Sequence, residues 1–219
     1  MTPRIVDLSH AIEDGMVTYP GLPAPQVDDW LTREASRERY APGVEFHMGR
    51  IDLLGNTGTY LDTPFHRFAD GHDLTAVPLE AVAGLPGAVV DATGPAIGPD
   101  AFSELGPLAG QALLVRTGWS RHWRTDTYGA GNHPFLTAEA CERIVELGPS
   151  LVGIDSLNID GTSTGERPAH TLLLGAGIYI VEHLTNLDAL DSPGFELFAV
   201  PLRVQGLGTS PVRAFARWT

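Results

Sequence analysis

The segment Asn56-Thr57-Gly58-Thr59-Tyr60-Leu61-Asp62-Thr63-Pro64-Phe65-His66 combines an acid, an imidazole, a glycine and a proline in one short stretch. Gly58 and Pro64 favour a turn at the end of a strand. Asp62 and His66 stand on either side of Pro64, and a proline-bent segment, unlike a straight strand, can direct both side chains into one pocket. A lone aspartate in such a turn often only caps an amide. The pair therefore predicts an acid–base or metal site if other segments supply partners.

Apolar runs on both sides of this segment predict the remaining fold. Strands are expected over residues 4–10, 45–54, 87–91, 112–117, 151–155, 177–182 and 196–204. Helices are expected over residues 79–83, 103–105 and 168–174, and between Thr137 as N-cap and Gly148 as stop. Strands outnumber helices, both occur throughout the chain, and no linker divides it. These patterns predict a single α/β domain over residues 1–219 with a β-rich core.

Composition excludes several classes of protein. The chain has 219 residues, 43% hydrophobic and 19% charged, which is typical of a folded globular protein. Its formal net charge is −13, from 14 Lys plus Arg against 27 Asp plus Glu. Such acidity argues against nucleic acid and anionic membranes as partners. No apolar run approaches the length of a membrane span and none resembles a signal peptide, so a cytoplasmic location is expected.

The single cysteine, Cys141, excludes an internal disulfide and a cysteine-rich zinc site. It shares one face of the expected helix with Ile144 and Val145, which predicts a buried structural thiol rather than a nucleophile.

Two later residues are the best partners for the opening segment. His170 begins an apolar run, and Glu182 closes the strand that follows it. Carboxylates and imidazoles that converge from separate strand ends build metal sites or acid–base pairs in α/β enzymes. His47 lies in the expected strand before the opening segment and could face the same pocket, with a structural role as an equal alternative. His10 belongs to the amino-terminal segment, and no ligand spacing supports a place for it in the site.

The opening segment resembles the His-x-Gly-Thr-His-x-Asp-x-Pro-x-His signature of the cyclase/kynurenine formamidase-like hydrolases, to which isatin hydrolases are related. Further blocks resemble this family in the same order along the chain: residues 7–21, 117–123, 153–160, 168–182 and 201–214. The resemblance implies a β/α sandwich, amide or lactam hydrolysis of a small molecule, zinc or manganese as cofactor, and assembly into oligomers.

Position by position, the resemblance places the first two signature histidines at Asn56 and Tyr60, the aspartate at Asp62 and the last histidine, the general base, at His66. It places the later histidine and glutamate of the family at His170 and Glu182. The first two positions are therefore not histidines in this chain.

These two replacements bear on the number of metal ions. A neutral amide such as that of Asn56 is a weak zinc ligand, and the phenol of Tyr60 must lose a proton with a pKa near ~10 to bind well. We expect the ion site that relies on these positions to be empty. At most one zinc or manganese ion is expected, on Asp62, His170 and Glu182, and a metal-free protein is the other alternative.

Three functions remain open at this stage. The first is hydrolysis of an amide, lactam or lactone bond in a small substrate, aromatic or not, with His66 as general base. The second is metal-independent cyclase or dehydratase chemistry through His66, Tyr60 and Glu182, with Asn56 orienting a carbonyl. The third is a non-catalytic ligand-binding homologue. A homodimer or larger homo-oligomer is expected, because the proline-rich loop at residues 19–25 is too apolar for a free flap.

Overall fold

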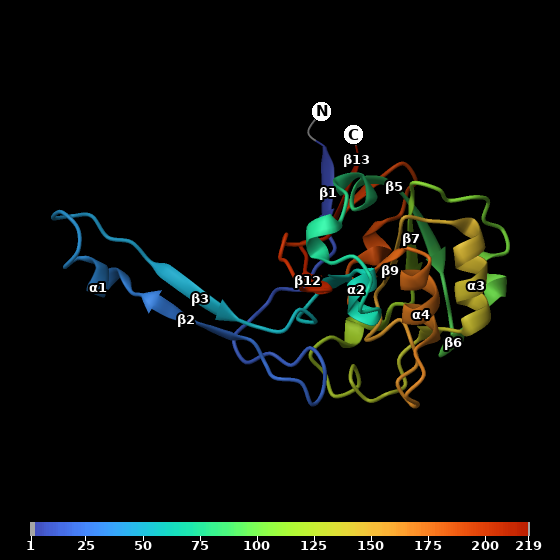
Figure 1. The fold of residues 1–219 in the computed structure, drawn as a ribbon, viewed down its shortest axis with the longest axis horizontal. Coiled ribbons are helices and arrows are strands. Elements are labelled where there is room, and N and C mark those ends of the chain that lie inside the picture. Colours follow the sequence, from blue (N-terminus) through green and yellow to red (C-terminus); the bar gives the residue numbers. More distant parts are fainter. Residues whose placement is uncertain (1–2, 219) are drawn as a thin grey trace.

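Residues 3–218, which the computed structural model describes, contain a curled, mixed sheet of nine strands (Figure 1). Across the sheet the order is β1 (Arg4–Asp7), β13 (Phe215–Trp218), β11 (Glu196–Phe198), β5 (Ala83–Asp91), β7 (Ala112–Arg116), β9 (Leu151–Ile154), β10 (Tyr179–Glu182), β4 (Tyr60–Asp62) and β12 (Thr209–Pro211). Neighbouring strands from β5 to β10 pair in parallel, and the other pairs are antiparallel. The predicted β-rich α/β class is confirmed.

Two apolar cores lie on opposite faces of this sheet. Along β7, Leu114 faces the first core and Leu113 the second. The second core is covered by α3 (Ala138–Leu147) and α4 (Pro168–Gly175), which lie together on one side of the molecule (Figure 1). Burial on both faces explains why the central strands read as continuous apolar runs rather than as alternating patterns.

The helix predicted after Thr137 is confirmed. The Thr137 side chain accepts the Ala140 N–H at 3.3 Å, and Gly148 ends the helix with a left-handed φ of 68°. Cys141 is fully buried in the second core, as expected, and burial raises the pKa of its thiol.

Several predicted elements were wrong in extent. The helix predicted over residues 103–105 lies earlier, as a 3-10 turn at Pro99–Phe102 that Pro99 begins, and the strand predicted over residues 4–10 ends at Asp7. Residues 79–83 form only a short 3-10 turn at Leu79–Ala81, because β5 begins at Ala83. The strand predicted over residues 196–204 ends at Phe198, ahead of Pro201, which cannot donate to a sheet ladder. The other elements are α2 (Pro64–Arg67), the paired short strands β6 (Ala96–Ile97) and β8 (Phe135–Leu136), and 3-10 turns at Leu74–Ala76, Pro99–Phe102, Trp119–His122 and Leu187–Ala189.

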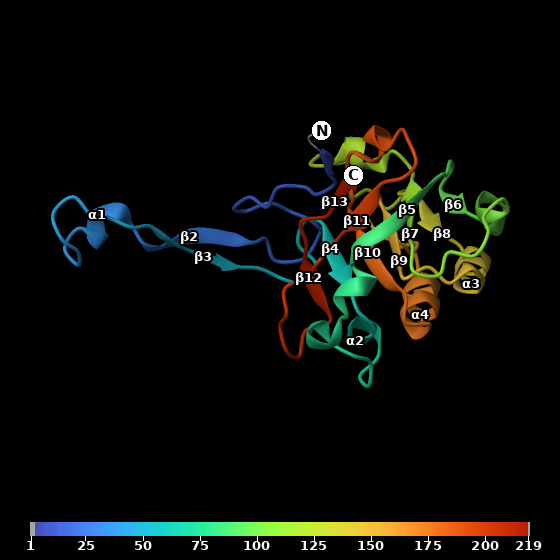
Figure 2. The ribbon, with the colours of Figure 1, turned by 90° about the horizontal axis from the view of Figure 1, so that it is seen from above.

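A second, two-stranded sheet forms an arm that projects from the body (Figures 1 and 2). It comprises β2 (Gln26–Leu31), α1 (Arg33–Ser36) and β3 (Met48–Asp52), and we call residues 26–52 the arm. Every residue of β3 and all of β2 except Leu31 are exposed. The sequence predicted a strand at β3 but not its partner β2, because the polar Gln26 and the adjacent Asp28 and Asp29 mask its strand pattern.

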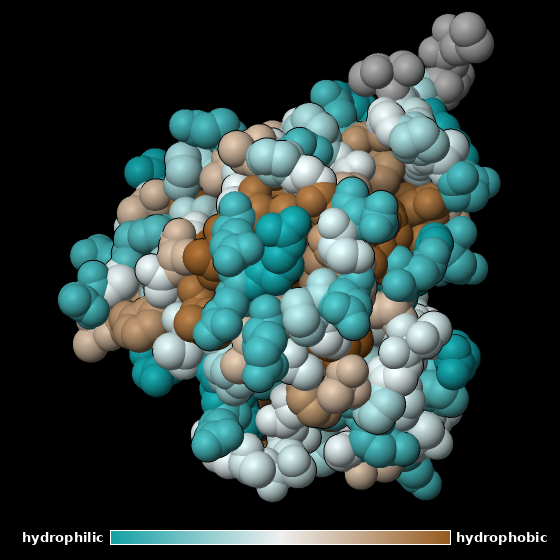
Figure 3. Space-filling model, turned by 90° about the vertical axis from the view of Figure 1, so that its right-hand side faces the viewer, coloured by the Kyte–Doolittle hydropathy of each residue, from teal (hydrophilic) through white to brown (hydrophobic). Residues whose placement is uncertain are grey.

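The face opposite the arm is mostly hydrophilic, and apolar residues show there mainly in recesses between polar side chains (Figure 3). Within residues 3–218, no helix has both the length and the apolar character needed to cross a membrane.

Candidate active site

Three antiparallel strands, β10, β4 and β12, set the geometry of the site. Tyr60 on β4 lies opposite Glu182 on β10, and Asp62 lies opposite Thr209 on β12. Residues two apart on a strand share a face, so Tyr60 and Asp62 point the same way while Leu61 enters the first core. The register of β4 therefore brings two hydroxyl groups and two carboxylates together, all four of them buried.

Each carboxylate accepts a hydrogen bond from the hydroxyl opposite it. Thr209 Oγ1 donates to Asp62 Oδ1 at 2.5 Å, and Tyr60 Oη donates to Glu182 Oε2. The backbone N–H of Ile159 donates to Glu182 Oε1 at 2.6 Å, so both oxygens of Glu182 have donors. Asp62 Oδ2 is buried and has no hydrogen-bond partner among residues 3–218. A buried carboxylate oxygen without a donor is costly, so this atom marks a place for a cation or a proton.

His66 follows β4 on the short helix α2, where Pro64 occupies the first helical turn. A Cβ at Gly208 would lie 2.4 Å from the His66 backbone nitrogen, so only glycine allows β12 to approach this closely. His66 Nδ1 is 2.8 Å from Thr209 Oγ1, whose one proton goes to Asp62. Nδ1 therefore carries a hydrogen and donates it, and Nε2 has no hydrogen-bond partner within residues 3–218.

His170 is held by a carboxylate from a neighbouring loop. Asp160 accepts the backbone N–H groups of Ala169 at 2.7 Å and His170 at 3.1 Å, and so caps the start of α4. It also contacts His170 Nδ1 at 2.6 Å. His170 Nε2 is thereby turned towards Asp62 Oδ2, at 3.7 Å, and Glu182 Oε1, at 3.9 Å. A carboxylate that fixes one nitrogen and frees the other is the usual support of a metal-binding histidine.

The charges of the site are strongly coupled. Burial opposes a charge on His170, but the hydrogen bond to Asp160 and the nearby carboxylates of Asp62 and Glu182 outweigh it and raise its pKa to about 10. Burial raises the pKa of Glu182 to about 7, although the positive charge of His170 opposes the shift. Burial and then the charge of Glu182 raise the pKa of Tyr60 well above 10, so its hydroxyl stays a neutral donor.

The donor atoms allow one compact metal site. Asp62, His66 and His170 can each offer a ligand atom, and these atoms lie within 4.8 Å of one another. Two imidazoles and one carboxylate suit zinc and leave a position open for water or substrate, and imidazole and carboxylate also suit manganese. This set has His66 where the sequence suggested Glu182, which approaches His170 but does not complete the compact group. The choice between the two ligand sets stays a prediction.

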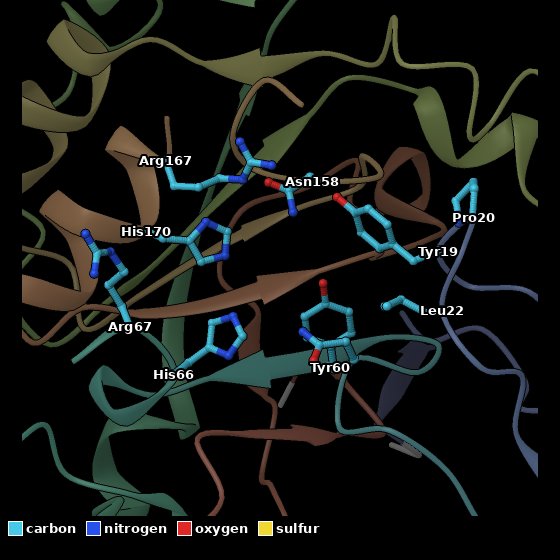
Figure 4. A pocket seen from close by; sticks show the side chains of 10 residues that line it. Tyr19, Pro20, Leu22, Tyr60, His66, Arg67, Asn158, Arg167 and His170 are labelled. Carbon is cyan, nitrogen blue, oxygen red and sulfur yellow. The ribbon is translucent and has the colours of Figure 1, made fainter. Parts of the chain in front are cut away.

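A cavity of about 390 Å³ opens beside these groups (Figure 4). It is lined by Tyr19, Pro20, Leu22, Asn56, Tyr60, His66, Arg67, Asn158, Arg167 and His170. The imidazoles and arginines lie on one side, and Tyr19, Pro20 and Leu22 lie on the other (Figure 4). Its volume is in the range of pockets for small organic ligands.

The structure brings together all six residues that the sequence singled out, in the cavity wall or directly behind it. Two weaker candidates lie elsewhere. His47 is on the arm, where its Nε2 forms a hydrogen bond with Asp29 Oδ1 at 2.6 Å. The ring of His10 stacks on that of Trp123, with the ring centroids 3.9 Å apart.

Other members of the site were not predicted: Thr209, Asp160, Asn158, Arg67 and Arg167. Nothing local in the sequence distinguishes them. Thr209 becomes relevant only through its pairing with Asp62, from which it is 147 positions distant.

The chain is similar to one protein family, to individual known sequences and to solved structures. The sequence model of a family described as putative cyclase matches residues 6–161. Kynurenine formamidase of Salinibacter ruber is 30% identical over 218 residues, covering 97% of each chain, and that of Bacillus cytotoxicus is 29% identical over 213 residues, covering 97% of this chain and 96% of the relative.

Among solved structures, isatin hydrolase A from Labrenzia aggregata bound to benzyl benzoate superposes with a TM-score of 0.82 at 26% identity, covering 99% of this chain and 94% of the other. A potential metal-dependent hydrolase with cyclase activity superposes with a TM-score of 0.79 at 25% identity, covering 100% and 99%.

The shared role of the Thr209 hydroxyl gives a test of this geometry. Thr209→Val keeps the shape of the side chain but leaves Asp62 Oδ1 and His66 Nδ1 without their partner. We expect the free energy of unfolding in chelator to fall by about 1–3 kcal/mol, as measured by urea denaturation. Thr209→Ser keeps the hydroxyl and should stay close to wild type. Equal stability of the valine variant and wild type would contradict the hydrogen-bond pattern.

Proposed function

The chain belongs to the putative cyclase family, and we propose that it hydrolyses the C–N bond of a small amide or lactam in the cavity beside His66 and His170. It is an enzyme of hydrolytic type, as its kynurenine formamidase and isatin hydrolase relatives are. These relatives support a metal-dependent amide hydrolase. The observation that carries the proposal is the compact set of Asp62, His66 and His170, of which the two histidines line the cavity.

We assign one zinc or manganese ion to these three side chains. The unpartnered Asp62 Oδ2, the oriented Nε2 of His170 and the open Nε2 of His66 fit a cation. When bound, the ion would polarise the scissile carbonyl and lower the pKa of a bound water. No second ion is proposed, because the Tyr60 hydroxyl already occupies Glu182.

Tyr60 and Glu182 are suited to move the proton of the hydrolytic water. Tyr60 lines the cavity, and its hydroxyl donates a hydrogen bond to Glu182. The pKa of Glu182, about 7, lies close to neutrality. As Tyr60 Oη accepts a proton from the cavity, its own proton can pass to Glu182, and the reverse transfer protonates the leaving amine. Tyr60 thus never has to become a phenolate. Asn56 lines the same cavity and can donate an amide hydrogen to the substrate carbonyl.

Two variants separate the possible roles of His66. We expect His66→Gln to lose both bound zinc and hydrolysis of N-formylkynurenine or isatin, with turnover reduced by more than ~100-fold. We expect Glu182→Gln to keep zinc and lose turnover. Zinc per chain is measured by elemental analysis after reconstitution, and hydrolysis by the absorbance change of the substrate.

Other outcomes of these experiments would assign different roles to the residues of the site. A His66→Gln protein that keeps zinc but loses turnover would make His66 the general base and Glu182 the third ligand. Ring closure or dehydration by zinc-free protein would favour the metal-independent alternative. Wild-type protein that converts neither amide nor lactam, with or without zinc or manganese, would contradict hydrolysis and favour a ligand-binding homologue.

We also propose that the protein assembles through its arm into a homodimer or larger homo-oligomer. Many of the large apolar residues exposed in the described chain lie on or beside the arm: Val27, Trp30, Tyr40, Val44, Phe46, Met48, Ile51 and Leu54. An isolated two-stranded ribbon is at best marginally stable in water. Its ion pairs, such as Arg50 with Asp28, are exposed and contribute little.

A second copy of the chain is the partner that best suits this arm. The exposed apolar side chains of the arm need a binding partner whenever the protein is folded, and only another copy of the chain is always present in equal amount. The body also exposes apolar side chains at Leu79, Val200, Leu202 and Leu207, and Leu79 and Val200 line one hollow of its surface. Exposed apolar surface of this extent is typical of interaction sites.

Substitutions on the arm test the assembly. We expect wild-type protein at micromolar concentration to have at least twice the monomer mass by light scattering, and Trp30→Ser with Phe46→Ser to shift it to monomer, because both remove apolar contact area. Ile5→Ser, at an exposed apolar position on β1 of the body, is the matched control and should keep the wild-type mass. A monomeric wild type would contradict assembly through the arm.

A further inference from the structure

We propose that Arg67 and Arg167 form a clamp for a carboxylate of the substrate, so that the preferred substrate is an amide that also carries an acid group. The proposal rests on the proposed function, because it names the substrate class of the same cavity. It assigns a binding role to two residues that neither touch the metal ligands by hydrogen bond nor belong to the acid–base pair.

Six of the 14 arginines form no ion pair within residues 3–218, and Arg67 and Arg167 are the two of these six that line the cavity. The chain holds 27 acidic against 14 basic residues, so most arginines find a carboxylate. Within residues 3–218, ion pairs are formed by Arg4, Arg37, Arg50, Arg116, Arg124, Arg143, Arg213 and Arg217. Arg67 and Arg167 form none in that part of the chain, although both line the cavity. Uncompensated cations in a pocket of an acidic protein point to an anionic ligand.

Arg167 is held in place with part of its guanidinium free. Its Nη1 donates to the carbonyl oxygens of Gly161, Thr164 and Glu166 at 3.2, 2.8 and 2.6 Å. Among the described residues, its Nε and Nη2 donate to no acceptor. A guanidinium fixed at one nitrogen and open at the others loses little entropy when it binds a carboxylate.

Arg67 is held in a similar way, by a hydrogen bond to a residue of α4. Its Nε donates to Thr171 Oγ1 at 3.2 Å, and the Thr171 hydroxyl in turn donates to the Arg167 carbonyl at 2.7 Å. Thr171 therefore links the two arginine segments. Both terminal nitrogens of Arg67 remain open within the described chain.

The positions of the arginines define where a ligand would lie. Arg67 follows His66 on α2, and Arg167 immediately precedes α4, which carries His170. Both lie on the imidazole side of the cavity, and Tyr19, Pro20 and Leu22 face them (Figure 4). A ligand with its carboxylate at the arginines and its amide at the imidazoles would place its apolar body against Tyr19 and Leu22.

A carboxylate fits better than a phosphate. When no cation balances them, the buried carboxylates of Asp62 and Glu182 repel a dianion about twice as strongly as a monoanion. A single carboxylate also matches the planar fork of a guanidinium. Phosphate binding is therefore an outcome that counts against the proposal.

Two amides of equal shape test the clamp: N-formylanthranilate, which is an acid, and N-formylanthranilamide, which is neutral. We expect wild-type protein to favour the acid in kcat/KM. Arg167→Gln and Arg67→Gln should each reduce kcat/KM for the acid by about 10- to 100-fold, mainly through KM, and change the neutral amide by less than about 2-fold. Arg167→Lys, which keeps the charge, should recover part of the loss.

Controls separate the clamp from structural effects and from the proposed function. Arg121→Gln removes a positive charge outside the cavity and should leave both substrates as in wild type. Calorimetric titration with benzoate should show binding to wild type that the two cavity variants lose, and inorganic phosphate at equal concentration should not compete. Equal loss for the acid and the neutral amide, no benzoate binding, or stronger phosphate binding would overturn the clamp. If neither amide is cleaved while benzoate still binds through the arginines, the proposed function fails and the clamp stands.

Discussion

The pairing of β4 with β10 on one side and β12 on the other is the constraint on which the site depends. It sets Tyr60 against Glu182 and Asp62 against Thr209, with all four side chains on one face. A slip of one residue would turn Tyr60 and Asp62 towards the apolar core and bring Leu61 into the site. The register is protected because Leu61 and Val181 pack into the first core, and because Gly208 lets β12 approach the His66 backbone.

The two hydroxyl groups change the chemistry that the two carboxylates can support. Glu182 takes donors at both oxygens, from Tyr60 and from the Ile159 backbone, whereas Asp62 takes one and keeps Oδ2 open. One cation, either a metal ion or the imidazolium of His170, then suffices to balance the site. The replacement of a signature histidine by Tyr60 fits this view, because the Tyr60 hydroxyl occupies the Glu182 oxygen that a second ion would need.

Much of this arrangement could be predicted from the sequence. The remainder depends on tertiary contacts, which local sequence patterns do not reveal. Asp62 and His66 share a proline-bent segment, so their convergence was evident, and the apolar runs ending at His170 and Glu182 supplied their partners. Thr209 and Asp160 could not be found in this way, because each acts through a contact that depends on tertiary pairing. Strand β2 of the arm escaped prediction for a related reason: it has no buried face to impose a pattern, since all of its residues except Leu31 are exposed. Arg67 and Arg167 became notable only once the structure placed them, without ion pairs among the described residues, on the wall of the cavity.

The number of zinc ions bound by each chain tests the central claim most directly. We would measure it by equilibrium dialysis and locate the ions by anomalous diffraction at the zinc edge, for wild type and for Asn56→His with Tyr60→His. We predict one zinc per wild-type chain, between Asp62, His66 and His170, and a second in the double variant, where Glu182 is released from the Tyr60 hydroxyl and two imidazoles are added. Two zinc ions in wild-type protein, or one centred on Tyr60 and Glu182, would contradict the claim.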